Sequence, residues 1–450
     1  MAEQQNPLAP RLDAAAGALI SDATLAGLSD ADSSILRYLG YDDGNAAAAE
    51  GRARMLRAAA RLHRLFLLPV PDAPGVVFFG GEADPALLDP RQVGSPIGSL
   101  AGSGLSPQRA FEACVGEGIE YLSQFVRADD AIEFGPLANY SEVYDPDTHR
   151  FISAVLAFTN VDPGKSIAWI AARRVRDGAP VRFPVDLCCR RPASQQDLTP
   201  PLKLSTGCAA GPTVEAAALH GTLELVERDA VALWWRGGRR GRPIADGSTA
   251  GREAAELLAQ MRQGKADRQS WLLDITTDIG IPAVVAVSTG SDGFGCALGF
   301  AARLSLSAAA RAAMFELIQM ELGQHVVAAK RHESGDESMN ENDRRQLRLA
   351  TLFDTKACGL LRPEGEPSGT SGEVPDDPAI GLQRINERLE ARGIAVHVLD
   401  LTRSDLEVPV VRILVPALQL EPCQIVSPRL AQTVLATGGG AVDNGGMHIL

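Results

Sequence analysis

Residues 205–235 read STGCAAGPTVEAAALHGTLELVERDAVALWW, and this stretch decides the fold class. Small and turn-forming residues open it, and an Ala-rich run with few β-branched residues follows. This pattern predicts a turn that leads into a long helix. Glu224 and Glu227 lie three residues apart in the run. That spacing places both carboxylates on one face of the helix.

Two further segments repeat the pattern. Gly102–Leu122 reads GSGLSPQRAFEACVGEGIEYL, and Ala301–Leu322 reads AARLSLSAAARAAMFELIQMEL. Each opens with small or turn residues and continues as a helix that carries two polar side chains three residues apart. These pairs are Glu117 with Glu120, and Glu316 with Gln319. We expect the three helices to bring their five carboxylates and one amide to one point.

The neighbours of these acids favour a site over a solvated helix surface. Glu117 lies between CVG and GI, Glu224 between TL and LV, and Glu316 between AMF and LI. Carboxylates in apolar surroundings are costly unless a cation pairs with them. Oxygen ligands in this number suit Mg²⁺, which also binds phosphate oxygens. The pattern therefore predicts a pocket for Mg²⁺-bridged ATP, with plain i,i+3 pairs on a helix surface as the alternative.

The turn before the second helix adds a candidate phosphate contact. Ser205 and Thr206 precede Gly207, and Gly211 follows shortly after. Backbone N–H groups at such a turn can hold phosphate at the start of a helix. The sequence contains no GxxxxGK[ST], no kinase signature and no GxGxxG, so the standard nucleotide-binding folds are not supported.

The rest of the chain predicts strands between Ala-rich helices. Residues 75–82, 166–187, 271–288 and 394–401 with 408–415 show strand patterns, whereas residues 1 to about 65 show a helical one. A mixed α/β (α+β) protein follows. The charged run 331–345 and the Pro- and acid-rich run 363–378 predict mobile surface loops, and the Gly-rich run 438–446 predicts a flexible tail.

Composition sets the broad class. The 450 residues contain 43 Lys and Arg against 56 Asp and Glu, a net charge of −13. An acidic chain is a poor binder of nucleic acid or of an anionic membrane. Seven scattered Cys without a CxxC pattern indicate reduced, mostly buried thiols. Without a signal peptide or a long apolar run, we expect a cytoplasmic protein.

The repeated motifs resemble those of YcaO-domain proteins. The resemblance rests on the two segments around Glu117 and Glu227, on ARAAMFELIQ, and on the later DLTRSDLEVPVVRILVPAL, in that order over residues 88–420. It implies a YcaO-like domain at 88–450, with strand-and-helix units around a carboxylate-lined nucleotide site. A short, mainly helical docking segment at 1–87 would precede it.

The resemblance also implies roles for individual residues. YcaO proteins use ATP and Mg²⁺ to activate backbone amides in ribosomally made peptides. Mg²⁺ ligands would be Glu117, Glu120, Glu224, Glu227 and Glu316. Nucleotide contacts would come from Arg228, Gln319 and Ser205, with an ion pair to Glu224 as the alternative role of Arg228. No residue is assigned as a nucleophile or general base.

Three activities remain open. The first is cyclodehydration of Cys, Ser or Thr to azolines. The second is peptide thioamidation with a TfuA partner, and the third is a non-catalytic scaffold that binds a peptide or partner. The five retained acids favour cyclodehydration. Ala216 in place of a usual acid favours the scaffold, and the absence of a Pro-x-Pro-x-Pro end weakens cyclodehydration relative to the other two activities. Expected partners are a precursor peptide, an E1-like leader-binding or TfuA protein, and a second copy of the chain.

Overall fold

The computed structural model describes residues 6–20, 30–369 and 377–449. The chain divides into two compact units. Unit 1 comprises Met1–Pro69, Val76–Gly221 and Val396–Leu414, and unit 2 comprises Val70–Gly75, Thr222–Ala395 and Val415–Leu450. Each unit is described by itself, because their relative positions are not determined. The predicted boundary between residues 87 and 88 stays a prediction.

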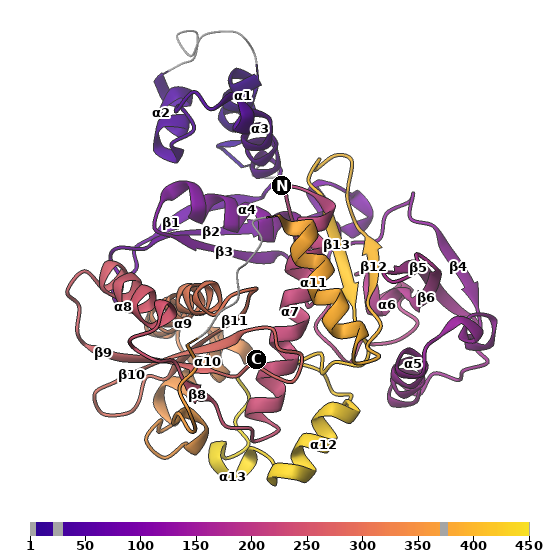
Figure 1. Ribbon diagram of the computed structural model, residues 1–450. Helices are drawn as coiled ribbons and strands as arrows, with labels where there is room; N and C mark the ends of the chain where they lie inside the picture. Colours follow the sequence, from indigo (N-terminus) through magenta and orange to yellow (C-terminus); the bar gives the residue numbers. More distant parts are fainter. Residues whose placement is uncertain (1–5, 21–29, 370–376, 450) are drawn as a thin grey trace. The chain divides into compact units, whose positions relative to one another are not determined.

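Unit 1 contains an α-β-β-β-α module, the first module. Helix α3 (Ala46–Ala60) leads into an antiparallel sheet of β1 (Arg64–Leu68), β2 (Val77–Ala83) and β3 (Gly98–Gly104), and α4 (Pro107–Ser123) follows. Helix α4 packs on β2 and β3 and also contacts α3 (Figure 1). Helices α1 (Ala9–Ile20) and α2 (Asp30–Leu39) precede this module and pack on each other.

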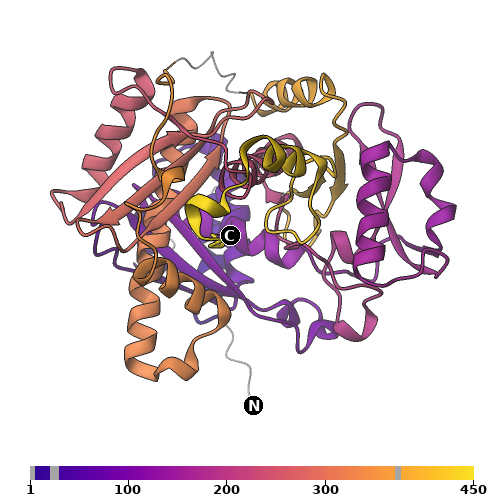
Figure 2. The ribbon, with the colours of Figure 1, turned by 90° about the horizontal axis from the view of Figure 1, so that it is seen from below.

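Unit 2 repeats this order in a second module. Helix α8 (Thr249–Arg262) leads into β9 (Arg268–Asp274), β10 (Ala283–Gly290) and β11 (Ala297–Ala302), and the long helix α9 (Leu306–Ser334) follows. The strands are again antiparallel neighbours, and the short β8 (Arg242–Pro243) joins the sheet beside β9. Helix α9 packs on β10 and β11 and contacts α8 (Figures 1 and 2).

The local sequence explains why both modules turn from strand into helix in the same way. Ser106 accepts a hydrogen bond from the Arg109 N–H and caps α4, as Ser305 does with Ala308 for α9. Gly102 on β3 and Gly299 on β11 let each strand approach its helix closely. A Cβ atom at either glycine would lie within 2.3 Å of helix backbone atoms.

A second sheet of unit 1 combines segments far apart in the chain. Its order is β4 (Ile132–Gly135), β5 (Ile167–Arg174), β12 (His397–Asp400), β13 (Val410–Leu414) and β7 (Cys208–Ala210), with β6 (Pro180–Pro184) paired to β5. Helices α5 (Pro146–Phe158) and α6 (Val185–Cys188) lie in the same unit. These strands confirm those predicted at 166–187, 394–401 and 408–415.

The remaining helices complete the described chain. They are α7 (Val214–Trp235), of which residues 222–235 belong to unit 2, and α10 (Glu341–Thr351), α11 (Pro378–Glu390), α12 (Pro428–Thr437) and α13 (Ala441–Asn444). All seven Cys are free and buried, as predicted. Among the described residues, no helix is long and apolar enough to cross a membrane.

The predicted loop at 331–345 is wrong. Helix α9 continues to Ser334, and α10 begins at Glu341. Asn340 and Asp343 form a capping box at the start of α10, and Lys330 donates to Asp343 over 2.7 Å. These contacts stabilise the end of α9 and the start of α10, although the charged composition of this run predicts a loop. Of the second predicted loop, residues 370–376 lie outside the described residues.

The predicted flexible tail is also wrong. Residues 441–444 form α13, and the Asn444 side chain donates to the Trp235 carbonyl over 2.8 Å at the end of α7. The Trp235 indole N–H in turn donates to the Met447 carbonyl. Trp234 and Trp235 are both buried.

The close approach at Gly102 gives a test of the fold. In Gly102→Ala the new Cβ would lie 2.2 Å from the Ala110 carbonyl oxygen and 2.3 Å from the Cys114 nitrogen. Because both are backbone atoms, we expect urea unfolding to show a loss of about 1–3 kcal/mol. Gly116→Ala, on α4 with nothing within 4 Å of the new Cβ, should instead stabilise by about 0.5–1 kcal/mol. Equal effects of the two changes would contradict the proposed strand–helix contact.

Candidate functional site

The two modules present one carboxylate each in the same manner. In the first module, the Ala101 N–H on β3 donates to Glu117 Oε2 on α4 over 2.6 Å. In the second, the Phe300 N–H on β11 donates to Glu316 Oε2 on α9 over 2.8 Å. Both bonds span sixteen residues. Glu117 and Glu316 are therefore structurally equivalent, as their places in the repeated segments suggested.

Two more of the predicted acids are held by strand amides. The Ala210 N–H on β7 donates to Glu120 Oε1 over 2.7 Å within unit 1. The Ala302 N–H on β11 donates to Glu227 Oε2 over 3.3 Å within unit 2. Each bond fixes one oxygen of the carboxylate at the edge of a strand.

Unit 2 gathers three of the predicted metal ligands around one cation. Arg228 Nη2 lies 3.3 Å from Glu224 Oε1, and Arg228 Nε lies 3.9 Å from Glu227 Oε1. The ion pair that the sequence offered as the alternative role of Arg228 is thus present. Glu316 also acts electrostatically on Arg228 and on Glu227. We call Glu224, Glu227, Arg228 and Glu316 the acid cluster.

Burial makes the ionised carboxylates of this cluster unfavourable when no further cation is bound. Desolvation raises the pKa of Glu227 to about 8, opposed by Arg228 and reinforced by Glu316 and Glu224. Burial likewise raises the pKa of Glu316, against the attraction of Arg228. Burial alone would lower the pKa of Arg228, but the carboxylates outweigh it and hold that pKa above its usual value. Additional positive charge near these carboxylates would therefore stabilise their ionised forms.

Arg303 is a cation that the sequence analysis missed. It follows β11 directly and lowers the pKa of both Glu227 and Glu316 by its charge. When all three carboxylates are ionised, they exceed Arg228 and Arg303 by one negative charge. Its position two residues before the cap Ser305 was the only signal in the sequence.

Unit 1 holds Glu117 beside another missed cation. Glu117 is exposed at the surface, but crowding by protein atoms raises its pKa to about 7, opposed by the Ala101 N–H and by Lys203. Lys203 belongs to the turn that contains Ser205. In that turn Ser205 is half-buried, its carbonyl accepts from the Cys208 N–H over 3.0 Å, and Gly207 has a φ of +81°.

The helix register of α7 decides where Glu215 and Ala216 lie. The helix starts at Val214, and the Thr213 hydroxyl accepts from the Ala216 N–H over 3.2 Å. Ala216 is buried, whereas Glu215 is exposed. Pro212 lies before the helix and does not shift its register. Gln319, the remaining predicted contact, is half-buried on α9, one turn after Glu316.

The residues of the acid cluster fit Mg²⁺ and phosphate in two respects. The excess negative charge suits a divalent cation. The Arg228 Nε is a buried donor without a hydrogen-bond acceptor, which a phosphate oxygen would supply. Within the described ranges, no three His, Cys, Asp or Glu side chains are placed so that they could hold a metal ion by themselves. Mg²⁺ commonly binds with few protein carboxylates plus phosphate and water.

Comparison with known proteins identifies the family. Residues 101–419 match the family model described as YcaO cyclodehydratase, ATP- and Mg²⁺-binding. The chain belongs to the YcaO family. This confirms the resemblance noted in the repeated motifs, and the family description matches the cofactors expected from them.

Solved structures confirm the fold. A heterocyclase in complex with substrate and cofactor matches with a TM-score of 0.62 and 23% identity, over 79% of this chain and 50% of the other. YcaO from Methanopyrus kandleri bound with AMPPCP and Mg²⁺ gives 0.56 and 19%, over 86% and 91%. The E. coli microcin synthetase McbBCD complex gives 0.59 and 14%, over 79% and 88%.

One curated relative also matches part of the chain. A protein encoded in the tfuA 3′ region of Rhizobium leguminosarum bv. trifolii is 30% identical over 234 residues. The match covers 48% of this chain and 53% of the relative, so the chain spans about half the length of that protein.

The raised pKa of Glu227 predicts a pH-dependent gain from its neutral isostere. Because the folded-state pKa lies near 8 and the unfolded value near 4.5, folding holds a proton that the unfolded chain releases. This contribution is present at low pH and is lost as pH rises toward 8. In EDTA, Glu227→Gln should therefore raise the melting temperature by more at pH 8.5 than at pH 5.5.

The control is Glu333→Gln, an exposed position near the end of α9. It should leave the melting temperature within about a degree of the wild type at both pH values, as surface substitutions usually do. Calorimetry in EDTA measures both variants. A gain for Glu227→Gln that does not change with pH would show that this carboxylate is not desolvated.

Proposed function

We propose that this chain uses ATP and Mg²⁺ to activate backbone amides of a ribosomally made precursor peptide. The observation that carries the proposal is the acid cluster, in which Glu224, Glu227 and Glu316 gather around Arg228 and desolvation raises the pKa of Glu227 and of Glu316. Family membership supports it. A solvated helix surface would not desolvate its acids in this way.

The chemistry requires positioning and neutralisation of charge. An amide oxygen leaves poorly until it is phosphorylated, and Mg²⁺-ATP supplies the phosphoryl group and the charge neutralisation for that step. The chain's own part would be to hold these groups. Glu224, Glu227 and Glu316 in unit 2, and Glu117 and Glu120 in unit 1, would bind Mg²⁺.

The same proposal gives the polar neighbours a role. The Arg228 Nε, which has no acceptor, would donate to a phosphate oxygen. Gln319 and the turn at Ser205 would add further nucleotide contacts. That the acids of both units converge on one point stays a prediction.

Two products are possible, and one observation favours the second. Attack by a Cys, Ser or Thr side chain on the activated amide gives an azoline, which is the activity that the family description names. Attack by a sulfur donor gives a thioamide. The position of the relative in a tfuA 3′ region favours thioamidation with a TfuA partner.

Mass spectrometry separates the two products. The chain is incubated with Mg²⁺-ATP and a peptide encoded beside its gene, with and without a neighbouring TfuA protein and sulfide. Loss of water from the peptide indicates an azoline, and exchange of oxygen for sulfur indicates a thioamide. An unmodified peptide together with no ATP turnover would leave the scaffold alternative.

The acid cluster predicts the effect of a single change on turnover. Glu227→Gln keeps the shape of the side chain and removes one charge from the proposed Mg²⁺ site. We expect ATP turnover to fall about 100-fold or more, while circular dichroism stays unchanged. Glu333→Gln on α9 is the matched control and should retain full turnover. Wild-type rates in Glu227→Gln would exclude this carboxylate from the site.

A further inference from the structure

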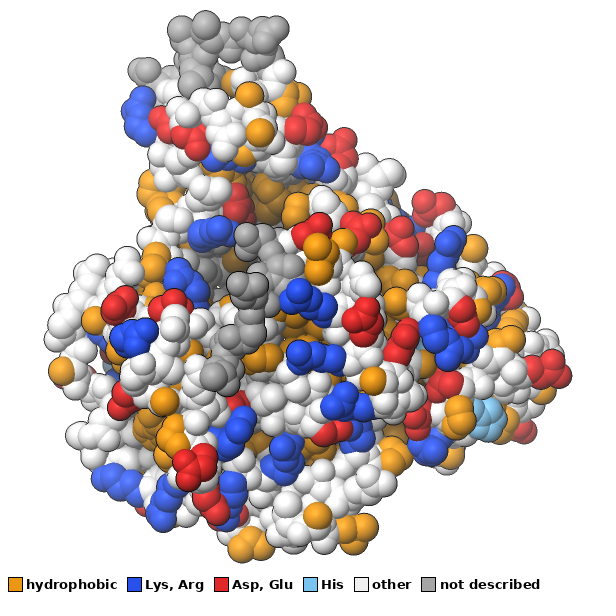
Figure 3. All heavy atoms as spheres, viewed as in Figure 1, with side chains coloured by type: hydrophobic (Ala, Val, Ile, Leu, Met, Phe, Trp, Pro, Cys, Tyr) orange, Lys and Arg blue, Asp and Glu red, His pale blue; other side chains and the backbone are white. Residues whose placement is uncertain are grey.

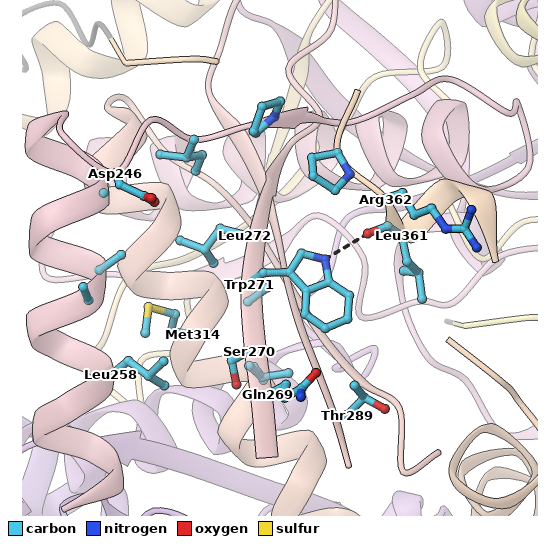
Figure 4. Close-up of a pocket in the computed structure, with 18 of the residues that line it drawn as sticks. Asp246, Leu258, Gln269, Ser270, Trp271, Leu272, Thr289, Met314, Leu361 and Arg362 are labelled. Atoms are coloured by element: carbon cyan, nitrogen blue, oxygen red, sulfur yellow. Dashed lines mark hydrogen bonds between the residues drawn. The ribbon is translucent and has the colours of Figure 1, made fainter. Parts of the chain in front are cut away.

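The sheet of the second module has an edge that is only partly covered. Strand β8 pairs with β9 through two residues, Arg242 with Asp274 and Pro243 with Leu273. The next residue, Ile244, instead forms a bridge with Ser368. A cavity of about 560 Å³ opens where the chain after β8 leaves β9 (Figure 4). We call this cavity the β9 groove.

Unpaired backbone groups of β9 face the groove. The Ile275 N–H donates to the Ala283 carbonyl over 2.8 Å, on the side of β10. Because backbone groups alternate in direction along a strand, those of Leu273 and Trp271 also face β10. Those of Ser270 and Leu272 therefore face away from β10. In the described part of the chain, no hydrogen bond reaches the backbone N–H or C=O of these two residues.

The side chains of the groove suit apolar groups. Trp271 and Leu272 are only half-buried, although they lie on a strand of the sheet. The indole N–H of Trp271 donates to the Leu361 carbonyl over 2.9 Å and so fixes the ring at the groove (Figure 4). Across the groove, α8 presents apolar side chains, among them Ala254 and Leu258.

The groove also has an excess of positive charge at one side. Lys356 and Arg362 both line it and are exposed. Lys356 Nζ donates to the Ser291 carbonyl over 3.1 Å, and Arg362 donates to the Lys356 carbonyl. No carboxylate of the described residues pairs with either cation. Both retain donors for an acidic group.

On the face seen in Figure 3, Lys and Arg side chains lie among Asp and Glu rather than in one broad basic area. Of the residues that line the groove, Lys356 and Arg362 are cationic and Asp246 is anionic. This balance suits one acidic residue of a ligand better than the phosphate chain of a nucleic acid.

We propose that the β9 groove binds an extended segment of the precursor peptide as an added strand beside β9. The backbone groups of Ser270 and Leu272 would pair with the peptide backbone, and an acidic residue of the peptide would meet Lys356 and Arg362. Strand addition gives affinity from the main chain and specificity from alternate side chains. The identity of the peptide rests on the proposed function, whereas the groove itself does not.

The test uses a short fluorescein-labelled peptide of alternating Val and Thr that ends in two Asp residues. Binding to the full chain is followed by fluorescence anisotropy without ATP. Two further peptides carry N-methyl groups, one on each alternate set of residues. An added strand points only one set toward β9. We expect one methylated peptide to bind about tenfold more weakly and the other to bind normally.

The protein variants test the cationic side of the groove. Lys356→Glu combined with Arg362→Glu should weaken the unmethylated peptide about tenfold. Arg348→Glu, an exposed position on α10 that does not line the groove, should bind it normally. No binding by the wild type, or equal effects of the two methylation patterns, would overturn the proposal.

ATP turnover of the same preparations separates this proposal from the proposed function. Turnover without peptide binding would overturn the groove and leave the proposed function standing. Methylation-sensitive binding without turnover would support the groove and contradict the proposed function.

Discussion

A hydrogen bond from a strand amide to a helix glutamate is the interaction on which the site depends. It occurs between Ala101 and Glu117 and again between Phe300 and Glu316, over sixteen residues each time. The bond requires the helix to lie close against the strand that precedes it. Gly102 and Gly299 permit that approach, and the caps Ser106 and Ser305 start the helices at the right residue.

The same bond explains how the fold tolerates its acids. Strand amides donate to one oxygen of Glu227 and of Glu316, and burial raises the pKa of both groups. Arg228 and Arg303 offset part of the charge in unit 2. A bound divalent cation would offset the remaining free-energy cost of burying these carboxylates close together. Perturbed pKa values in a cluster of carboxylates are typical of a metal and nucleotide site.

Much of this arrangement could be predicted from the sequence. The three repeated segments located the helices and their acids, and alternating apolar residues located the strand pairs. The αβββα duplication could not be recognised, because it rests on pairings between strands such as β9 and β11 with β10. Arg303 and Lys203 could not be predicted, because each acts on carboxylates of helices to which it does not itself belong.

The errors share a physical cause. The run 331–345 looked like a loop by composition, but Lys330 and a capping box at Asn340 end and start helices there. The Gly-rich tail looked flexible, but Asn444 is bonded to the end of α7. In both cases a tertiary or capping contact outweighed the local composition.

A double-mutant cycle tests the central claim that the acid cluster is one Mg²⁺–nucleotide site. Electron paramagnetic resonance would measure the affinity for Mn²⁺ in the presence of a non-hydrolysable ATP analogue. The proteins are the wild type, Glu227→Gln, Glu316→Gln and the double variant. Two ligands of one ion should give losses that are not additive, with a coupling of about 1 kcal/mol or more. Additive losses, or unchanged Mn²⁺ affinity in the double variant, would contradict the account.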